Sequence, residues 1–149
     1  MLNNFGTQNG SLPVPKQNRA EPVEIWKARN FIHQDPAGEL SLTRVAGAVN
    51  VSPNHLSEKF KQVTGVNFVV YVSRLRFERA RNLLHDTDRR ISEIAFAAGF
   101  QSLSQFNRVF KKLSGHSPTE YRAQRVQRGK VHSVAKRNRS APKYRRKNA

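Results

Sequence analysis

Apolar residues through the middle of the chain recur three or four positions apart, the spacing that places them on one face of an α-helix. The first such stretch includes Ile25 and Ile32 and stops near Asp35-Pro36, because a residue before proline disfavours the helical conformation. A longer stretch from Phe68 to about Leu84 predicts a helix of about 25 Å. Since no convincing strand pattern is present, the chain is predicted to be all-α.

The same region contains an internal repeat with an offset of about 50 residues. The corresponding positions are Val45-Ala46 and Ile94-Ala95, Asn50-Val51 and Gly99-Phe100, Ser52 and Ser102, Leu56 and Phe106, Phe60-Lys61 and Phe110-Lys111, Gly65 and Gly115, and Tyr71 and Tyr121. Chance rarely matches apolar, turn and cap positions in the same order. The chain is therefore predicted to contain two copies of one helical unit.

Each copy has the pattern of a helix-turn-helix motif. A small alanine permits close helix packing, a residue able to adopt a positive φ (Asn50 or Gly99) forms the turn, and a half-apolar, half-polar helix follows. One such pattern is a weak indication of DNA binding. Two such patterns joined by a stiff helix are a stronger indication of DNA binding, because major-groove segments on one face of B-DNA recur every ~34 Å. We expect these motifs at about 42–64 and 91–114, with the linking helix at about 67–84.

The two ends of the chain lack this periodicity, and we expect the structured region to cover residues 21–125. Residues 1–20 are rich in Asn, Gly, Gln and Pro, which is typical of a flexible arm. Residues 126–149 are basic and poor in large apolar residues, which is typical of a disordered tail. This tail either adds sequence-independent affinity for a polyanion, the alternative that we favour, or only keeps the protein in solution.

The formal net charge of +17 suits a polyanionic partner, but its distribution limits what it establishes. From Arg125 onward there are ten basic residues and no acidic one. The first 124 residues contain the other 17 basic residues and all ten acidic ones, a net charge of +7. A non-specific nucleoid or RNA-binding protein would account for this charge, but it would not account for the repeat.

Several other functional classes lack the residues that they need. The chain has no cysteine, which excludes disulfides and Cys-based zinc sites. Its five histidines are scattered, and it has no HExxH motif, acidic cluster or phosphate-binding glycine loop. We therefore expect no enzymatic activity, no metal and no cofactor. No apolar run approaches the length of a membrane span, so we expect no membrane partner and a cytoplasmic protein.

The repeat region contains a set of distinctive short motifs. They are Ile91 to Ala95, Gly99-Phe100, Phe106 to Lys112, Gly115, Ser117-Pro118 and Tyr121-Arg122 in the second copy, and Ser52 to Lys61 with Gly65 in the first. Over about residues 22–124 this pattern resembles the DNA-binding domain of the AraC/XylS family of bacterial transcription regulators. The resemblance implies seven helices in two helix-turn-helix subdomains joined by a linking helix. It also implies promoter DNA as partner and activation through contact with RNA polymerase.

Many members of that family carry an additional effector-binding or dimerisation domain, for which a chain of 149 residues has no room. We therefore expect either a stand-alone regulator or the DNA-binding part of a longer one. The protein is expected to be a monomer, or a dimer only through a missing domain. In both cases the predicted function is sequence-specific binding of double-stranded DNA.

Base contacts are expected near the N-terminus of the second helix of each motif, on its outward face. The candidates are Asn54, Ser57 and Glu58 in the first unit, and Leu103, Ser104, Asn107 and Arg108 in the second. Arg108 suits guanine and the asparagines suit adenine. For Arg108 a contact with phosphate or a solvated surface position is the alternative, and we favour a contact with base or phosphate. Leu103 either contacts a thymine methyl group or packs in the core. Glu58 departs from the family pattern and either accepts from a cytosine amine or, as we favour, pairs with Lys61.

Phosphate contacts are expected from helix N-termini and from nearby hydroxyl and cationic groups. The candidates are Arg44, Ser52, Lys61, Arg74, Arg76, Ser102 and Lys111. On the linking helix the alternative is a set of ordinary surface ion pairs, Arg74 with Glu78 and Glu78 with Arg81. The phenylalanines at positions 60, 100, 106 and 110 are expected in the core, and not as a stacking platform for single strands.

Overall fold

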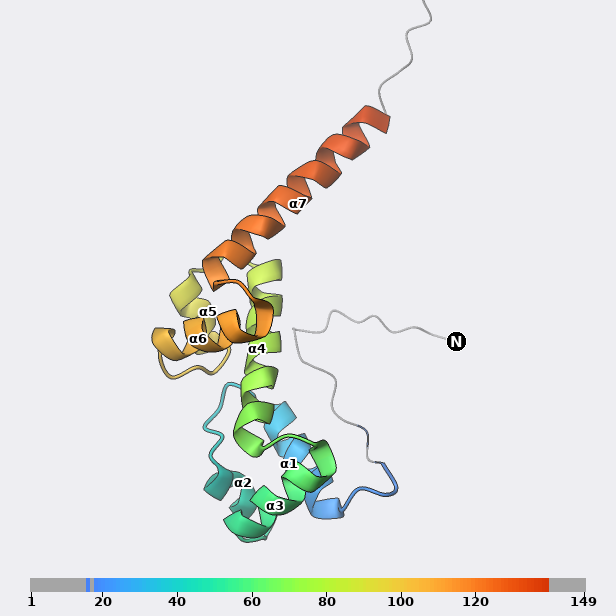
Figure 1. The fold of residues 1–149 in the computed structure, drawn as a ribbon, viewed down its shortest axis with the longest axis vertical. Helices are drawn as coiled ribbons and strands as arrows, with labels where there is room; N and C mark the ends of the chain where they lie inside the picture. Colours follow the sequence, from blue (N-terminus) through green and yellow to red (C-terminus); the bar gives the residue numbers. More distant parts are fainter. Residues whose placement is uncertain (1–15, 17, 140–149) are drawn as a thin grey trace, which may run out of the picture.

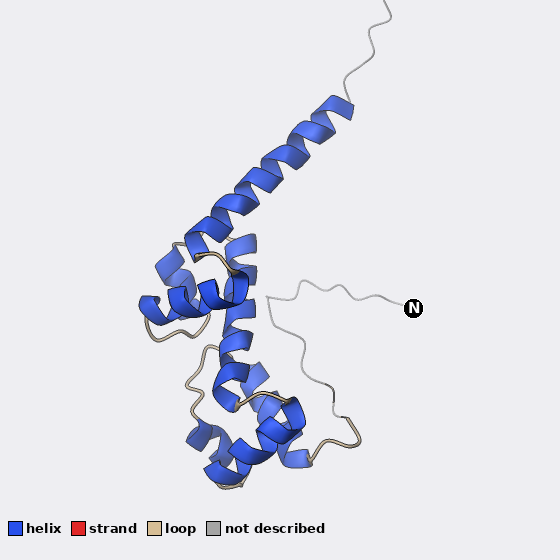
Figure 2. Cartoon of the chain, in the orientation of Figure 1, coloured by secondary structure: helices blue, strands red, loops and turns tan. Residues whose placement is uncertain are grey.

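The computed structural model describes residues 16 and 18–139, with side chains through residue 128. Within this range the chain forms seven helices and no strand, which confirms the predicted all-α, tandem helix-turn-helix fold class (Figures 1 and 2). The helices are α1 (Val23–Gln34), α2 (Leu42–Ala48), α3 (Pro53–Thr64), α4 (Phe68–Asp86), α5 (Ile91–Ala97), α6 (Leu103–Ser114) and α7 (Pro118–Arg139). Helices α1–α3 surround one end of α4, and α5–α7 surround the other (Figure 1).

The first unit packs α1, α2 and α3 against the N-terminal half of α4. Its core side chains are at most 8% exposed, and they are Ile25, Ala28, Ile32, Val45, Ala46, Leu56, Phe60, Phe68, Val72 and Leu75. The ring of Phe60 packs edge-on against those of Phe68 and Tyr71, with centroid separations of 5.8 and 5.0 Å. Removing this apolar surface from water is the main force that holds the three short helices on α4.

The second unit packs α5, α6 and α7 against the C-terminal half of α4. Its buried residues are Phe77, Ala80, Leu84, Ile94, Ala95, Ala98, Phe100, Phe106 and Phe110. Phe106 and Phe110 lie one turn apart on α6, with ring centroids 5.5 Å apart. Phe100 packs on the first of these rings and Phe77 on the second, with centroids 5.1 and 4.9 Å apart. The four phenylalanines expected in the core are at most 3% exposed, so that prediction is confirmed.

Helix α4 is the element that both units share. Its inward face changes from one core to the other between Leu75 and Phe77, and no side chain belongs to both cores. With 19 residues it is about 28 Å long. None of the described helices, α4 included, is both long enough and apolar enough to cross a membrane.

Equivalent positions of the two units have the same cap geometry. Ser52 and Ser102 cap α3 and α6, each accepting a hydrogen bond from the main-chain N–H three residues further on. Both helices end at a glycine, Gly65 or Gly115, with φ 79° and ψ −5°. This left-handed conformation favours glycine and ends the helix. The two motifs therefore begin and end their second helices in the same way.

The turns inside the two motifs are equivalent as well. The residues predicted to adopt a positive φ do so, with 59° at Asn50 and 101° at Gly99. The next residue in each turn donates its N–H to the carbonyl of an alanine in the preceding helix, at 3.1 Å in the first unit and 3.0 Å in the second. Each turn thus fixes the direction in which its second helix leaves.

The last helix is longer than the sequence predicted. Helix α7 continues to Arg139, so the prediction of disorder from Val126 is wrong for residues 126–139. Arg, Lys, Gln and Ala have high helix propensity, and extending a helix whose first turns are already packed costs little. At the other end, residues 18–20 of the predicted arm belong to a turn that Glu21 closes by donating to the Asn18 carbonyl at 2.9 Å. The rest of the arm and positions 140–149 lie outside the described residues, apart from residue 16.

Candidate nucleic-acid interface

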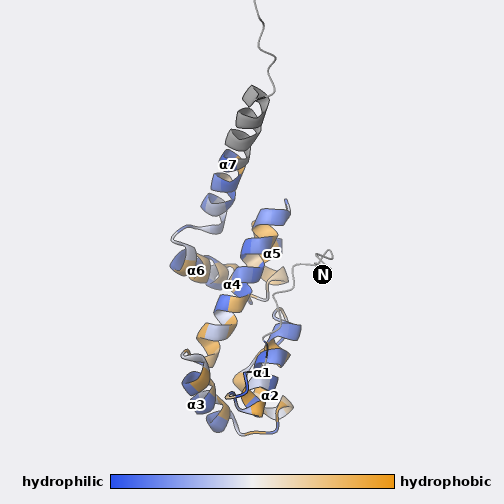
Figure 3. Ribbon diagram, turned by 90° about the vertical axis from the view of Figure 1, so that its right-hand side faces the viewer, coloured by the Kyte–Doolittle hydropathy of each residue, from blue (hydrophilic) through white to orange (hydrophobic). Residues whose placement is uncertain are grey.

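The second helices of the two motifs lie on the same side of the molecule. In the view of Figure 3, α6 is to the left of α4 and α3 lies below the lower end of α4, and both are to the left of α1, α2 and α5. The side chains of Leu56 and Phe60 on α3, and of Phe106 and Phe110 on α6, are buried towards the cores. The opposite, polar faces of α3 and α6 are therefore available on one side of the protein.

On α3, the predicted base-contacting residues lie at or near the surface. Asn54 and Glu58 are exposed and Ser57 is half-buried. His55 lies within 3.4 Å of Glu24 of α1, measured from Nε2 to Oε1. A main-chain hydrogen bond and this histidine lower the pKa of Glu24 below its usual range. The contact ties the N-terminal turn of α3 to α1.

Among the described residues Glu58 forms no ion pair, so the expected pair with Lys61 is wrong. One turn of helix separates the two residues, and both are exposed, so water competes with any contact between them. The Glu58 carboxylate is therefore open on the polar face of α3.

On α6, all four predicted base-contacting residues are exposed. They are Leu103, Ser104, Asn107 and Arg108. Leu103 is 41% exposed, so it does not pack in the core. Arg108 has no ion-pair partner among the side chains that the structure describes. The N-terminal half of α6 thus presents an aliphatic group, two small polar groups and a guanidinium group together.

The predicted phosphate-contacting residues occupy both ends of these helices. Ser52 and Ser102 are exposed at the N-termini, and Lys61 and Lys111 are exposed in the last turns, roughly 14 Å away along each helix. Arg44 is exposed near the start of α2 and lies 3.3 Å from Glu39. Exposed ion pairs of this kind are weak, so Arg44 can exchange Glu39 for another anion.

The two candidate arginines of α4 differ in their surroundings. Arg74 is exposed, and the expected pair with Glu78 is absent among the described residues, because Glu78 instead pairs with Arg81 at 2.6 Å. Arg76 is half-buried and donates to the carbonyls of Pro36 and Gly38, each at 2.9 Å. Burial lowers its pKa. The structure therefore gives Arg76 protein partners in place of the predicted phosphate.

A buried polar network in the first unit was not predicted from the sequence. Arg29 forms an ion pair with Glu21 at 2.8 Å, and the Tyr71 hydroxyl lies 2.8 Å from His33 Nε2 and 3.4 Å from Arg29 Nε. Burial, followed by the charge of Arg29, lowers the pKa of His33. Tyr71 was identified only as the counterpart of Tyr121, and no local pattern points to its partners. The network fixes α1 to α4 and supports the position of α3.

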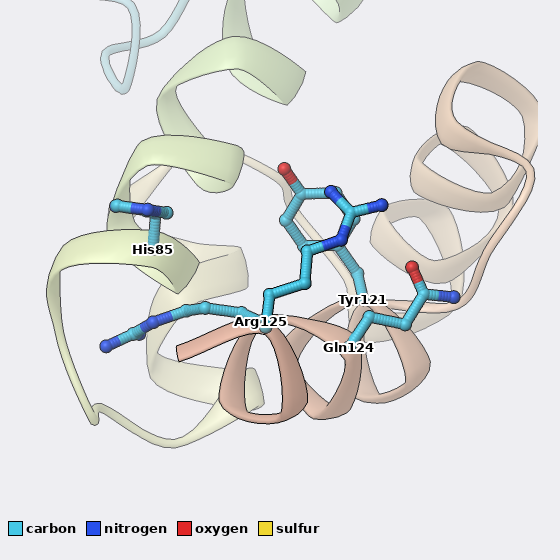
Figure 4. A pocket seen from close by; sticks show the side chains of 5 residues that line it. His85, Tyr121, Gln124 and Arg125 are labelled. Carbon is cyan, nitrogen blue, oxygen red and sulfur yellow. The ribbon is translucent and has the colours of Figure 1, made fainter. Parts of the chain in front are cut away.

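In the second unit, a groove of about 320 Å³ lies between the end of α4 and the start of α7 (Figure 4). It is lined by His85, Tyr121, Gln124, Arg125 and Arg128. Arg125 Nη1 donates to the carbonyl of Leu84 at 2.7 Å, which supplies a hydrogen-bond donor to an acceptor in the last turn of α4. The groove is thus the seam where α7 is attached to α4. Elsewhere in the described part of the chain, no three metal-ligating side chains come together.

Comparison with known proteins agrees with this geometry. A family model described as a helix-turn-helix domain matches residues 45–124. The uncharacterized HTH-type transcriptional regulator YijO of Escherichia coli K12 is 38% identical over 96 residues, which are 64% of this chain. The match covers only 34% of that relative, so this chain corresponds to about a third of it.

Two solved structures are similar over nearly their whole length. One is a transcriptional regulator with an AraC-type DNA-binding domain from Chromobacterium violaceum, 34% identical with a TM-score of 0.63, covering 70% of this chain and 93% of that one. The other is the C-terminal domain of AraT, a response regulator from Geobacillus stearothermophilus, 31% identical with a TM-score of 0.67, covering 87% and 96%. The chain therefore belongs to the AraC family of helix-turn-helix transcription regulators, a family of DNA-binding proteins and not of enzymes.

Proposed function

We propose that this protein binds double-stranded DNA sequence-specifically and recognises two adjacent major-groove segments of one duplex with α3 and α6. The observation that carries the proposal is that both helices lie on the same side of the molecule, to the left of α1, α2 and α5 in Figure 3, and have exposed polar residues. The α4 helix that joins the two units is about 28 Å long, a length comparable to the ~34 Å repeat of the major groove. One protomer would then cover the whole site without dimerising.

In this proposal each unit contributes its own base contacts. Arg108 donates both guanidinium nitrogens to guanine, and Asn54 and Asn107 contact adenine. Leu103 contacts a thymine methyl group, and Glu58, free of Lys61, accepts from a cytosine amine. Ser57 and Ser104 contact either kind of base pair. All of these side chains except the half-buried Ser57 are exposed, which supports the assignment.

Phosphate contacts in the proposal position the two helices without selecting a sequence. The N-termini of α3 and α6, with Ser52 and Ser102, each direct main-chain N–H groups and a positive dipole end at one phosphate. The cationic contacts are Arg44, Lys61, Arg74 and Lys111. Arg76 is left out of the proposal because its donors already face main-chain carbonyls.

The basic extension of α7 supplies sequence-independent affinity in this proposal. From Tyr121 to Arg139 the helix contains seven Lys or Arg residues and no acidic residue. It extends away from the second unit, obliquely to the long axis of the molecule (Figure 1). Neutralising phosphates of flanking DNA would release counterions, and binding would then weaken steeply with salt.

Binding is tested by selecting duplexes from a random pool and measuring competition in rising salt. We expect a preferred, asymmetric site of about 20 base pairs that survives excess random duplex. Arg108→Ala should weaken binding about 5- to 150-fold, with the loss confined to one base step of the site. Lys112→Ala, which removes a positive charge from the same helix, should weaken all duplexes equally and only slightly. Equal competition by random duplex would overturn the proposal in favour of a non-specific nucleoid protein.

We extend the proposal to activation of transcription in the cytoplasm, through contact with RNA polymerase. Resemblance to the AraC family supports this output, and a monomer bound beside a promoter leaves its other faces open to polymerase. Transcription in vitro from a promoter carrying the selected site should rise when the protein is added. A fall in transcript at saturating protein would identify a repressor instead.

A further inference from the structure

The connection between α1 and α2 extends from the first unit towards the second. Figure 1 shows this connection rising alongside α4 to the level of the loop that precedes α6. It contains Pro36, which is buried, and Gly38, whose N–H donates to the Asp35 carbonyl at 3.1 Å. The extensive helix packing lies within each unit or involves α4. This connection therefore provides contact between the units that does not pass along α4.

Arg76 holds the connection against α4. The residue lies at the point where α4 changes from one core to the other, between Leu75 and Phe77. Its Nε donates to the Pro36 carbonyl and its Nη2 to the Gly38 carbonyl, each at 2.9 Å. One guanidinium group thus bonds both ends of a three-residue loop some 40 positions away. The fork geometry of arginine suits such a two-point contact better than a lysine would.

The second unit packs on the other side of this loop through Gly99, the turn residue of its helix-turn-helix motif. A Cβ atom built on Gly99 would lie 2.7 Å from the Ala37 Cα and 2.7 Å from the Pro36 oxygen. It would also lie 2.8 Å from Arg76 Nε. All three distances are shorter than real Cβ atoms show, so only glycine permits this approach.

The preceding helix of the second unit is fixed to α4 at the same level. Arg79 Nε donates to the Ala97 carbonyl at 3.0 Å, at the end of α5. The turn at Gly99 then leads into α6 within four residues. Arg76, the loop of residues 36–38 and Gly99 are named here the interunit brace. The brace joins the first unit to the turn that directs α6.

We propose that the interunit brace fixes the distance and rotation between α3 and α6, and so makes DNA recognition depend on the spacing of the two groove segments. This inference rests on the proposed function. A single helix joining two units can bend and twist about its middle, which is where α4 leaves one core for the other. A second attachment at that level prevents this motion. Without the brace, each unit would still fold and would reach its groove segment independently.

The brace is tested first without DNA. Because the chain has no cysteine, Gln62→Cys on α3 and Lys112→Cys on α6 provide two exposed, unique sites for spin labels. Electron–electron double resonance should give one narrow distance distribution in this background. Arg76→Met, which keeps the length of the stem and removes both hydrogen bonds, should broaden it. Arg81→Met, which removes an arginine elsewhere on α4, should not.

The second test measures affinity for the selected duplex before and after two base pairs are inserted between its groove segments. The insertion displaces one segment by about 7 Å and rotates it by about 70°. The wild type should lose at least about tenfold in affinity, because one unit no longer reaches its bases. Arg76→Met should lose less than about threefold relative to its own uninterrupted site. Arg81→Met should show the wild-type loss.

The outcomes separate this inference from the proposed function. Suppose that a duplex is selected, and that Arg76→Met has the same insertion penalty and the same label distances as the wild type. This result overturns the brace and leaves specific binding intact. The brace is also overturned if the wild type binds the duplex with the insertion as tightly as the uninterrupted one. A narrow label distance in the wild type that broadens in Arg76→Met supports the brace even if no duplex is selected. Should circular dichroism show that Arg76→Met is unfolded, Arg76→Lys, which keeps the charge but not the two-point contact, replaces it in both tests.

Discussion

The two helix-turn-helix units have closely matching backbones and dissimilar outer faces. Thr64 and Ser114, at equivalent positions, donate their hydroxyls to a carbonyl four residues earlier, at 2.7 Å in both units. Each hydroxyl lies 2.9 Å from the carbonyl two residues later as well. On the polar faces the equivalent positions Glu58 and Arg108 have opposite charges. Helix α6 has three basic residues and no acidic one, whereas α3 has two basic residues and one acidic one.

This difference shows where each kind of constraint acts. Caps, turns and core contacts define the angle at which the second helix is presented, so both units keep them. Apart from the contact of His55 with Glu24, the outward faces of α3 and α6 have few partners within the described protein, so they are free to differ. In terms of the proposed function, both faces discriminate between bases, and the basic face of α6 contributes more to affinity than the mixed face of α3.

The largest expected effect comes from breaking one core and leaving the other intact. Phe60→Ala and Phe110→Ala should each destabilise their own unit by about 3–5 kcal/mol, since each removes a fully buried ring. The single tryptophan, Trp26, lies on α1 and reports on the first unit. In urea titrations, Trp26 fluorescence should shift strongly in Phe60→Ala and less in Phe110→Ala. Far-UV circular dichroism, which follows helix content in both units, should detect the loss of stability in both variants. Equal fluorescence shifts would mean that the two units unfold as one.

A smaller effect is expected from exchanging the turn residues. Gly99→Asn should cost about 2–4 kcal/mol, because a Cβ there would collide with the main chain at Ala37. Asn50→Gly should change stability by less than about 1 kcal/mol, since Asn50 is exposed and glycine adopts its φ of 59° without strain. Thermal unfolding of the two variants measures the difference. Equal costs would show that the turns are equivalent in packing as well as in backbone geometry.

Neutralising Glu58 on α3 and neutralising Arg108 on α6 should have different effects on DNA binding. Arg108→Gln should reduce affinity for the selected duplex by about 1–3 kcal/mol. Glu58→Gln should raise affinity for random duplex slightly, because it removes a negative charge from a surface that faces phosphates, and should reduce discrimination at one base pair. Fluorescence anisotropy with selected and random duplexes measures both changes. Parallel losses in the two variants would contradict the division of roles.

The smallest expected effect concerns the cap of α7, which has no full counterpart at α4. Ser117 N–H donates to the Glu120 carboxylate at 2.7 Å, and Glu120 N–H donates to the Ser117 hydroxyl at 3.2 Å. At α4 only the side chain of Asn67 caps, and the position equivalent to Glu120 is Val70. The Ser117 N–H lowers the pKa of Glu120 below 4.5.

Because the folded state lowers this pKa, the stabilisation is present above pH 4.5 and is lost as the pH falls through the folded value. Glu120→Gln should therefore be less stable than the wild type near neutral pH, and the difference should vanish in acid. Thermal midpoints across a pH series measure it. A difference that persists at the lowest pH would show that the carboxylate charge is not the cause.

The parts of the fold that follow local rules could be predicted from the sequence. Ser52-Pro53 and Gly65 determine where α3 begins and ends, and their counterparts do the same for α6, because capping depends on only a few neighbouring residues. The positive φ at Asn50 and Gly99 is local in the same sense. The exposed positions of the candidate base-contacting residues follow from helical periodicity.

The remaining features depend on contacts between residues distant in sequence. Helical periodicity predicts that Arg74 and Arg76 both lie on the surface of α4. Only the fold shows that residues 36–38 lie against Arg76. The open Glu58 carboxylate depends on a competition with water that spacing does not decide. The length of α7 does not follow from apolar periodicity, because residues 126–139 have few large apolar side chains and are helical through their helix propensity.

The separation of the two cores has a consequence for how binding preferences could change. Since Leu75 and Phe77 divide α4 into two inward faces, a new set of side chains on α3 leaves the packing beneath α6 untouched. In terms of the proposed function, half of the binding specificity could therefore be altered by mutation while the other half keeps a new variant attached to related promoters. A regulator built in this way can acquire new target genes in steps, without passing through a form that binds nothing.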